Sequence, residues 1–100
     1  MKKGEEMESN TEYLLKYISN NAYQKLLTKK TYQLASLAHD RRDVELNIRY
    51  LIKLGMKNAD YLVRERIEEL LLPHHDFIKK MNQYLNKVSK EEFINMLENS

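Results

Sequence analysis

The sequence has no cysteine and no tryptophan, and it has only one proline and two glycines among 100 residues. The absence of cysteine excludes disulfide bonds, thiolate metal sites and catalysis by a thiol, so the fold depends on non-covalent packing. Proline and glycine most often mark turns, and their scarcity leaves long stretches without a conformational break. The composition therefore excludes a disulfide-rich scaffold and a thiol enzyme.

Long apolar runs are also missing. The strongest apolar stretch, residues 67–72, is interrupted by Glu68 and Glu69 and is far shorter than the roughly 20 residues that span a bilayer. The opening residues 1–3 are positively charged, as in a signal peptide, but no apolar stretch follows them. We therefore expect a cytoplasmic protein that does not associate with a membrane.

Motifs of catalysis or cofactor binding are not recognisable. Gly4 and Gly55 stand alone, so there is no glycine-rich phosphate-binding loop. His39 with the pair His75-Asp76 resembles part of the motif of metal-dependent phosphohydrolases of the HD type, but no aspartate follows to complete it. We expect no enzymatic activity, no metal or other cofactor and no small-molecule substrate, with the histidines exposed or at helix ends.

Apolar residues recur at helical spacing through most of the chain. The sequence predicts an all-α protein, with a disordered tail at 1–9 and a single helical domain at 10–100. The domain is expected to be a compact bundle of five to six short helices, either orthogonal or up-and-down. Residues 11–39 are predicted to form two helices that meet near 19–21, or else one continuous helix.

The boundaries of the later helices have clearer signals. Asp40 or Asp43 is positioned to cap a third helix, and Gly55 follows its last apolar residue, Leu54, where a helix-ending glycine often lies. The inward face of this helix is predicted to contain Val44, Ile48, Leu51 and Ile52.

Three further helices are predicted in the C-terminal half. A fourth helix is expected to begin at Asn58 and to continue to about residue 72, where Pro73 stops it or opens the next. Ser89 and Glu92 form a capping box, in which each side chain satisfies a free backbone amide of the other, so a last helix should begin there.

Positive charge is unevenly distributed along the chain. The net charge is only +2, yet segment 16–42 has a net charge of +5 and segment 77–90 a net charge of +4. Tyrosines lie among these cations, a combination that can stack on bases while it binds phosphates. The candidate contacts to a partner or a nucleic acid are Lys25, Lys29, Lys30, Tyr32, Arg41, Arg42, Lys79, Lys80, Tyr84 and Lys87.

Seven tyrosines and five methionines suit a protein interface. A domain this small buries only roughly 60–65% of its unfolded surface, so its stability is expected to be marginal unless it docks on a partner. The sequence therefore favours a non-enzymatic helical protein-binding module, an adaptor, inhibitor or regulator, whose partner is another protein or a second copy in a homodimer. The alternative is a nucleic-acid-binding accessory protein that uses segments 16–42 and 77–90. Abundant lysine, asparagine and tyrosine are typical of an AT-rich genome, as in some bacteria and mobile elements.

The predicted inward faces can be tested by truncating one leucine on each of two helices. If Leu51 and Leu70 are buried, Leu51→Ala and Leu70→Ala should each lower the free energy of unfolding by about 2–5 kcal/mol, because each leaves a cavity. Chemical denaturation measures this change. Losses below about 1 kcal/mol would mean that the faces are assigned incorrectly.

Overall fold

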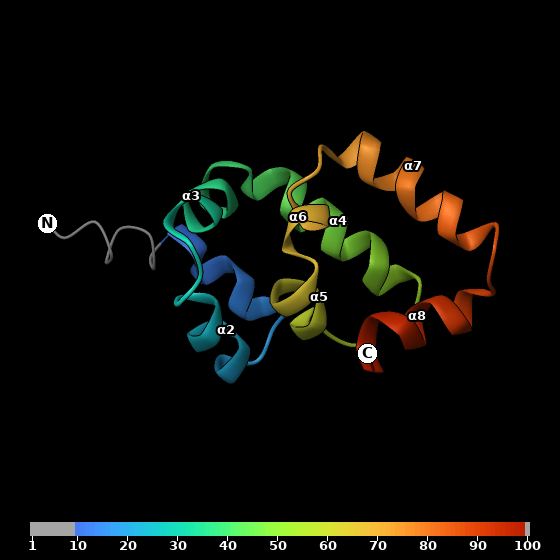
Figure 1. The fold of residues 1–100 in the computed structure, drawn as a ribbon, viewed down its shortest axis with the longest axis horizontal. Helices are drawn as coiled ribbons and strands as arrows, with labels where there is room; N and C mark the ends of the chain where they lie inside the picture. Colours follow the sequence, from blue (N-terminus) through green and yellow to red (C-terminus); the bar gives the residue numbers. More distant parts are fainter. Residues whose placement is uncertain (1–9, 100) are drawn as a thin grey trace, which may run out of the picture.

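The computed structural model describes residues 10–99, so the predicted tail at 1–9 lies outside the described residues. All the secondary-structure elements of the described part are helices and none is a strand, which confirms the predicted all-α class (Figure 1). Its elements are the 3-10 helix η1 (Glu12–Lys16) and the α-helices α2 (Asn20–Leu26), α3 (Thr31–His39), α4 (Arg41–Lys53), α5 (Asp60–Glu65), α6 (Ile67–Leu70), α7 (His74–Leu85) and α8 (Lys90–Asn99).

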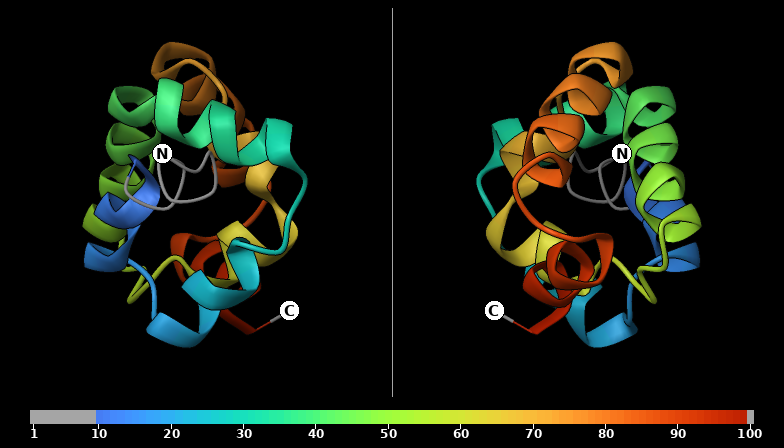
Figure 2. Two further views of the ribbon diagram at one scale, coloured as in Figure 1. Left: turned by 90° about the vertical axis from the view of Figure 1, so that its left-hand side faces the viewer. Right: turned by 90° about the vertical axis from the view of Figure 1, so that its right-hand side faces the viewer.

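The helices run in several directions around a common core (Figures 1 and 2). Of the two predicted arrangements, the bundle is therefore the orthogonal one and not the up-and-down one. The longest helix, α4, packs against α3, α6 and α7. The short helix α2 packs against α5 and η1, and α5 also contacts α6 and α8. Helices α2 and α7 consequently lie toward opposite ends of the long axis of the molecule (Figure 1).

Residues 11–39 form three segments, so the predictions of one or two helices are both wrong. The chain turns between α2 and α3, where the Thr28 hydroxyl donates a hydrogen bond to the Lys25 carbonyl at 2.6 Å and so competes with continued helix. The start of α2 is capped by Ser19, whose hydroxyl accepts from Ala22 N at 3.1 Å. Polar side chains that bond to the local backbone therefore define both ends of α2.

Gly55 ends α4 as predicted, with a positive φ of 119°. Gly55 N donates to Ile52 O at 3.0 Å and Met56 N donates to Leu51 O at 3.0 Å, the two hydrogen bonds of a Schellman motif. At the other end of α4, Asp40 occupies the N-cap position, but its side chain makes no capping hydrogen bond. The expected capping signal is thus confirmed at the C-terminus of this helix and not at its N-terminus.

The predicted fourth helix is interrupted. The described part therefore has one more helix here than the sequence predicted. Asn58 accepts from Asp60 N at 3.0 Å near its start, close to the expected position. Arg66 then leaves the helical conformation, with φ −133° and ψ 39°, and separates α5 from α6. The side chain of Arg66 is held at this break by an ion pair with the Glu69 carboxylate, 2.7 Å away. The change of direction lets α5 pack against α2 and α8 while α6 packs against α4.

The capping box before α8 is present. Glu92 N donates to the Ser89 hydroxyl at 3.1 Å, and Ser89 N faces the Glu92 carboxylate at 3.5 Å. Pro73 occupies the N-cap position of α7, so it opens this helix, which was one of its two predicted roles.

The core contains most of the residues predicted to face inward. Leu51 and Leu70 are both fully buried, which confirms their assigned faces. Ile52 is 38% exposed, so its predicted inward position is wrong. Consecutive residues of a helix point about 100° apart, and the buried stripe of α4 is set by Val44, Ile48 and Leu51, which leaves Ile52 at its edge.

A buried asparagine joins α4 to the corner between α6 and α7. The Asn47 amide nitrogen donates to Leu70 O at 3.0 Å and to Leu72 O at 2.9 Å. Because both amide hydrogens are used, the Asn47 carbonyl oxygen must accept from His74 Nδ1, 2.8 Å away, so this ring nitrogen carries a proton. The backbone nitrogen of His74 also donates to Asp43 at 3.1 Å.

Replacing Asn47 should therefore destabilise the fold more than an ordinary polar truncation. Asn47→Ala removes the partner of the buried Leu70 carbonyl, of the partly buried Leu72 carbonyl and of a ring N–H, and we expect it to lower the free energy of unfolding by about 2–4 kcal/mol. Asn86→Ala, at an exposed position just after α7, should change it by no more than about 0.5 kcal/mol. Urea denaturation of both variants makes the comparison, and equal losses would contradict the role assigned to Asn47.

Candidate functional site

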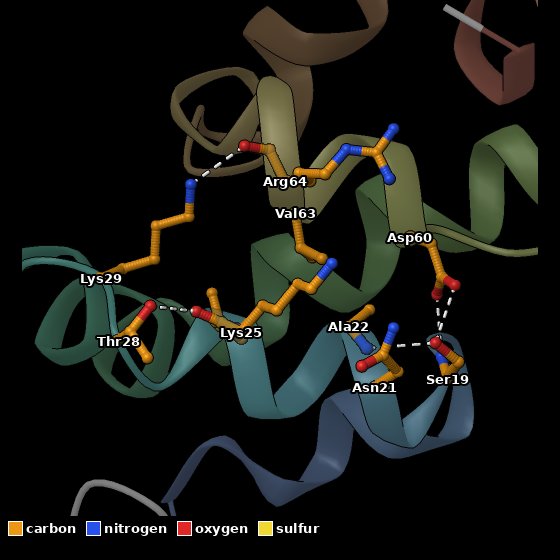
Figure 3. A pocket seen from close by; sticks show the side chains of 10 residues that line it. Ser19, Asn21, Ala22, Lys25, Thr28, Lys29, Asp60, Val63 and Arg64 are labelled. Carbon is orange, nitrogen blue, oxygen red and sulfur yellow. Dashed lines mark hydrogen bonds between the residues drawn. The ribbon is translucent and has the colours of Figure 1, made fainter.

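A groove of about 330 Å³ lies between α2 and α5 (Figure 3). Its floor is apolar, because Leu26 and Val63 are buried there and Ala22 lies beside them. Cationic and polar side chains surround this floor. The residues that line the groove are Ser19, Asn21, Ala22, Lys25, Leu26, Thr28, Lys29, Asp60, Val63 and Arg64.

Hydrogen bonds hold the two helices together at both ends of the groove. At one end, Asp60 accepts from the backbone nitrogen and from the hydroxyl of Ser19, each at 2.8 Å. At the other end, the Lys29 ammonium donates to the Arg64 carbonyl at 2.9 Å (Figure 3). The carbonyls in the last turn of a helix have no partner within it, so Lys29 supplies one. The walls of the groove are therefore fixed relative to each other.

Three cations line the groove, and they differ in what they bind. Lys29 is engaged with the α5 backbone, and Arg64 lies 3.4 Å from Glu65 and 5.6 Å from the ring centroid of Tyr61. Lys25 is exposed, extends across the groove toward Val63 (Figure 3), and has no acceptor among the described residues. An ammonium without a partner beside an apolar floor favours a ligand that carries both a negative charge and an apolar group.

Only part of the predicted contact set lies at this groove. Lys25 and Lys29 line it, whereas Lys30 lies nearby with its ammonium 6.0 Å from the ring centroid of Tyr32, which is 57% exposed. Arg41 is on α4, where it binds Glu45.

The predicted contacts of segment 77–90 lie on α7 or directly after it. Lys80 binds Glu69 at 3.3 Å, and Tyr84 stacks on Phe93 with ring centroids 5.8 Å apart, so this tyrosine is part of the packing. Lys79 and Lys87 are exposed. Because α7 lies far from α2 along the molecule (Figure 1), the ten predicted residues do not gather on one face.

Sequence reasoning predicted only Lys25 and Lys29 among the ten lining residues, and those that it missed include Ser19, Asp60 and Arg64. Arg64 lies in a segment with more acidic than basic residues, so a charge sum along the chain conceals it. A signal for the other two does exist in the sequence. Ser19 and Asp60 each stand directly before or at the start of a helix, where short polar side chains satisfy free backbone amides.

A second cationic cluster surrounds Glu45 on the outer face of α4. The Glu45 carboxylate lies 3.2 Å from Lys16 Nζ, 2.9 Å from Arg41 Nε and 3.5 Å from Arg49 Nη2. The Tyr17 hydroxyl donates to the same carboxylate at 2.6 Å. Burial raises the pKa of Glu45, but the hydrogen bonds from Tyr17, Arg41 and Lys16 outweigh it and lower the pKa to about 2.

Comparisons of this chain with protein-family models, with curated proteins and with solved structures find no match. Within residues 10–99, no group of three or more histidine, aspartate or glutamate side chains is arranged to hold a metal ion. No helix in the described part of the chain is long and apolar enough to cross a membrane.

The Glu45 cluster predicts a specific loss of stability in acid. The pKa of Glu45 in the folded state, about 2, lies below its ordinary value of 4.5. Its ionised form therefore stabilises the fold above pH 4.5, and this stabilisation is lost as the pH falls from 4.5 toward 2. Glu45→Gln should lower the melting temperature at neutral pH and have progressively less effect across this acid range. A difference from the unmodified chain that stays constant with pH would contradict the assignment.

Proposed function

We propose that this chain is a non-enzymatic protein-binding module, an adaptor, inhibitor or regulator, whose α2–α5 groove takes a short acidic segment of a partner protein. The observation that supports this proposal most directly is the Lys25 ammonium, which has no acceptor among the described residues and lies over a buried apolar floor. A carboxylate of the partner would bind Lys25 while a neighbouring apolar side chain covers Leu26 and Val63.

The size and rigidity of the groove support a peptide rather than a nucleic-acid strand. A volume of about 330 Å³ accommodates one or two side chains. The cations at its edge would bind a carboxylate or a phosphate, but its apolar floor suits only an apolar group. Because hydrogen bonds fix both ends, little conformational entropy is lost when the groove is filled. Carboxylates beside an apolar residue satisfy both parts of this surface.

The experiment titrates the full chain with the pentapeptide Glu-Glu-Leu-Glu-Glu and follows its backbone amides by nuclear magnetic resonance. We expect shifts confined to α2 and α5 at about millimolar peptide, because a groove this small gives weak affinity for a free pentapeptide. Lys25→Glu should weaken binding by more than about tenfold, since it replaces attraction by repulsion between like charges.

Lys30→Glu is the matched control, because it makes the same change of charge a few residues away at a side chain that does not line the groove. It should weaken binding less than about threefold. Equal effects of the two substitutions, or shifts that spread over α7, would contradict the proposal. Light scattering of the chain with and without the peptide tests the homodimer alternative. A dimer that buries the groove would release monomers when the peptide binds.

The alternative function, a nucleic-acid-binding accessory protein, draws on a different surface. Helix α7, which bears Lys79, and the groove at α2 lie too far apart along the molecule to form one basic face (Figure 1). The outer face of α4, however, concentrates arginines that the groove does not use. The two functions are compatible, because they need different residues.

A further inference from the structure

The outer face of α4 presents a row of cations to solvent. Arg42, Arg49 and Lys53 are all exposed, and their spacing of seven and four residues places them on one stripe of the helix. At a rise of 1.5 Å per residue the row is about 16 Å long. Helix α4 packs against α3, α6 and α7 through its other side. On the row itself Arg49 Nε donates to the Tyr17 hydroxyl at 3.2 Å, and all three side chains stay exposed.

Two more cations lie beside the row and are held in place. Lys16 and Arg41 converge with Arg49 on the Glu45 carboxylate, yet their side chains remain 54%, 55% and 59% exposed, respectively. Arg41 also lies over the Tyr13 ring, 4.9 Å from its centroid. The partly buried carboxylate therefore fixes the positions of three cations whose charged ends still face solvent.

The two ends of the row have no partners. Arg42 and Lys53 make no ion pair or side-chain hydrogen bond with any described residue. The acidic groups next to the row are Asp40, at the start of the helix, and Glu45. Asp43, also in the first turn, faces α7, where it accepts from His74 N at 3.1 Å. With Lys16 and Arg41 included, the surface keeps a net charge of +3.

We propose that this face of α4 binds the sugar–phosphate backbone of double-stranded nucleic acid. Three of the five arginines of the chain lie here, and the planar guanidinium matches phosphate with two parallel hydrogen bonds. A row about 16 Å long spans roughly five phosphates of one strand. The surface belongs to a single helix and is hollowed only by a wide, open depression lined by Arg41, Arg42, Glu45, Leu46 and Arg49. A helix fits the major groove of a duplex.

The nucleic-acid surface is separate from the α2–α5 groove and does not rest on the function proposed for it. None of its cations lines the groove, and none of the groove residues belongs to α4. A chain with both surfaces would hold an acidic protein segment on one side while it contacts nucleic acid on another.

The test measures the fluorescence anisotropy of a labelled 20-base-pair DNA duplex with the full chain at about 50 mM salt and above. We expect micromolar binding, with an affinity that falls steeply as salt rises because phosphate contacts release counterions. Arg42→Ala combined with Lys53→Ala should weaken binding by about tenfold or more and lower the salt slope by about two. Neither side chain has a partner in the fold, so the variant should keep its melting temperature.

The matched control is Lys79→Ala combined with Lys87→Ala, which also removes two exposed positive charges, but from the α7 region. It should weaken binding less than about threefold and leave the salt slope unchanged. Equal losses from the two double variants would overturn the proposal, because the binding would then reflect overall charge. The same conclusion would follow if the unmodified chain bound no duplex at about 50 mM salt.

Lys25→Glu separates this proposal from the one for the groove. It should weaken peptide binding by more than about tenfold and leave the salt slope for the duplex unchanged, because Lys25 is not on α4. If it removed duplex binding as completely as the α4 double variant does, the row on α4 would not be the nucleic-acid surface.

Discussion

The relation between α4 and the C-terminal half depends on the side chain of Asn47. Helix α6 ends at the buried Leu70, and the carbonyls of Leu70 and Leu72 both accept from the buried side chain of Asn47. One amide from α4 serves both carbonyls and also accepts from His74, so a single buried group connects three helices. A leucine of similar size would fill the same space but leave these polar groups without partners, which is costly in the interior.

The short helices explain why such side-chain bonds are needed and how the groove arises. Helices of four to seven residues do not form alone in water, so α2, α5 and α6 exist only because other parts of the chain hold them. Ser19, Asp60 and Lys29 do this for α2 and α5, and the same bonds fix the spacing of the groove walls. The interactions that stabilise the weakest helices therefore also shape the candidate binding site.

Much of the fold is predictable from the sequence where a local signal specifies the backbone. Gly55 ends α4, and the pair Ser89 and Glu92 caps the start of α8, as the sequence predicts. Each of these signals involves only residues a few positions apart. The break at Arg66 is different, because hydrophobic periodicity continues across it and the deciding contacts are with distant helices. Likewise Lys25 was predictable as a surface cation, but its place opposite Arg64 depends on how α2 and α5 pack.

The net charge of the chain is a poor guide to where its surface binds an anion, because acidic groups such as Glu45 and Glu69 already form ion pairs within the fold. Glu45 holds three cations, and Glu69 binds Arg66 and Lys80. Charges separated by more than about 8 Å are largely screened at physiological salt, so an incoming anion responds to the cations next to it rather than to the total of +2. The cations that remain without partners in the described structure, above all Lys25 and Arg42, therefore determine where a negatively charged partner gains most.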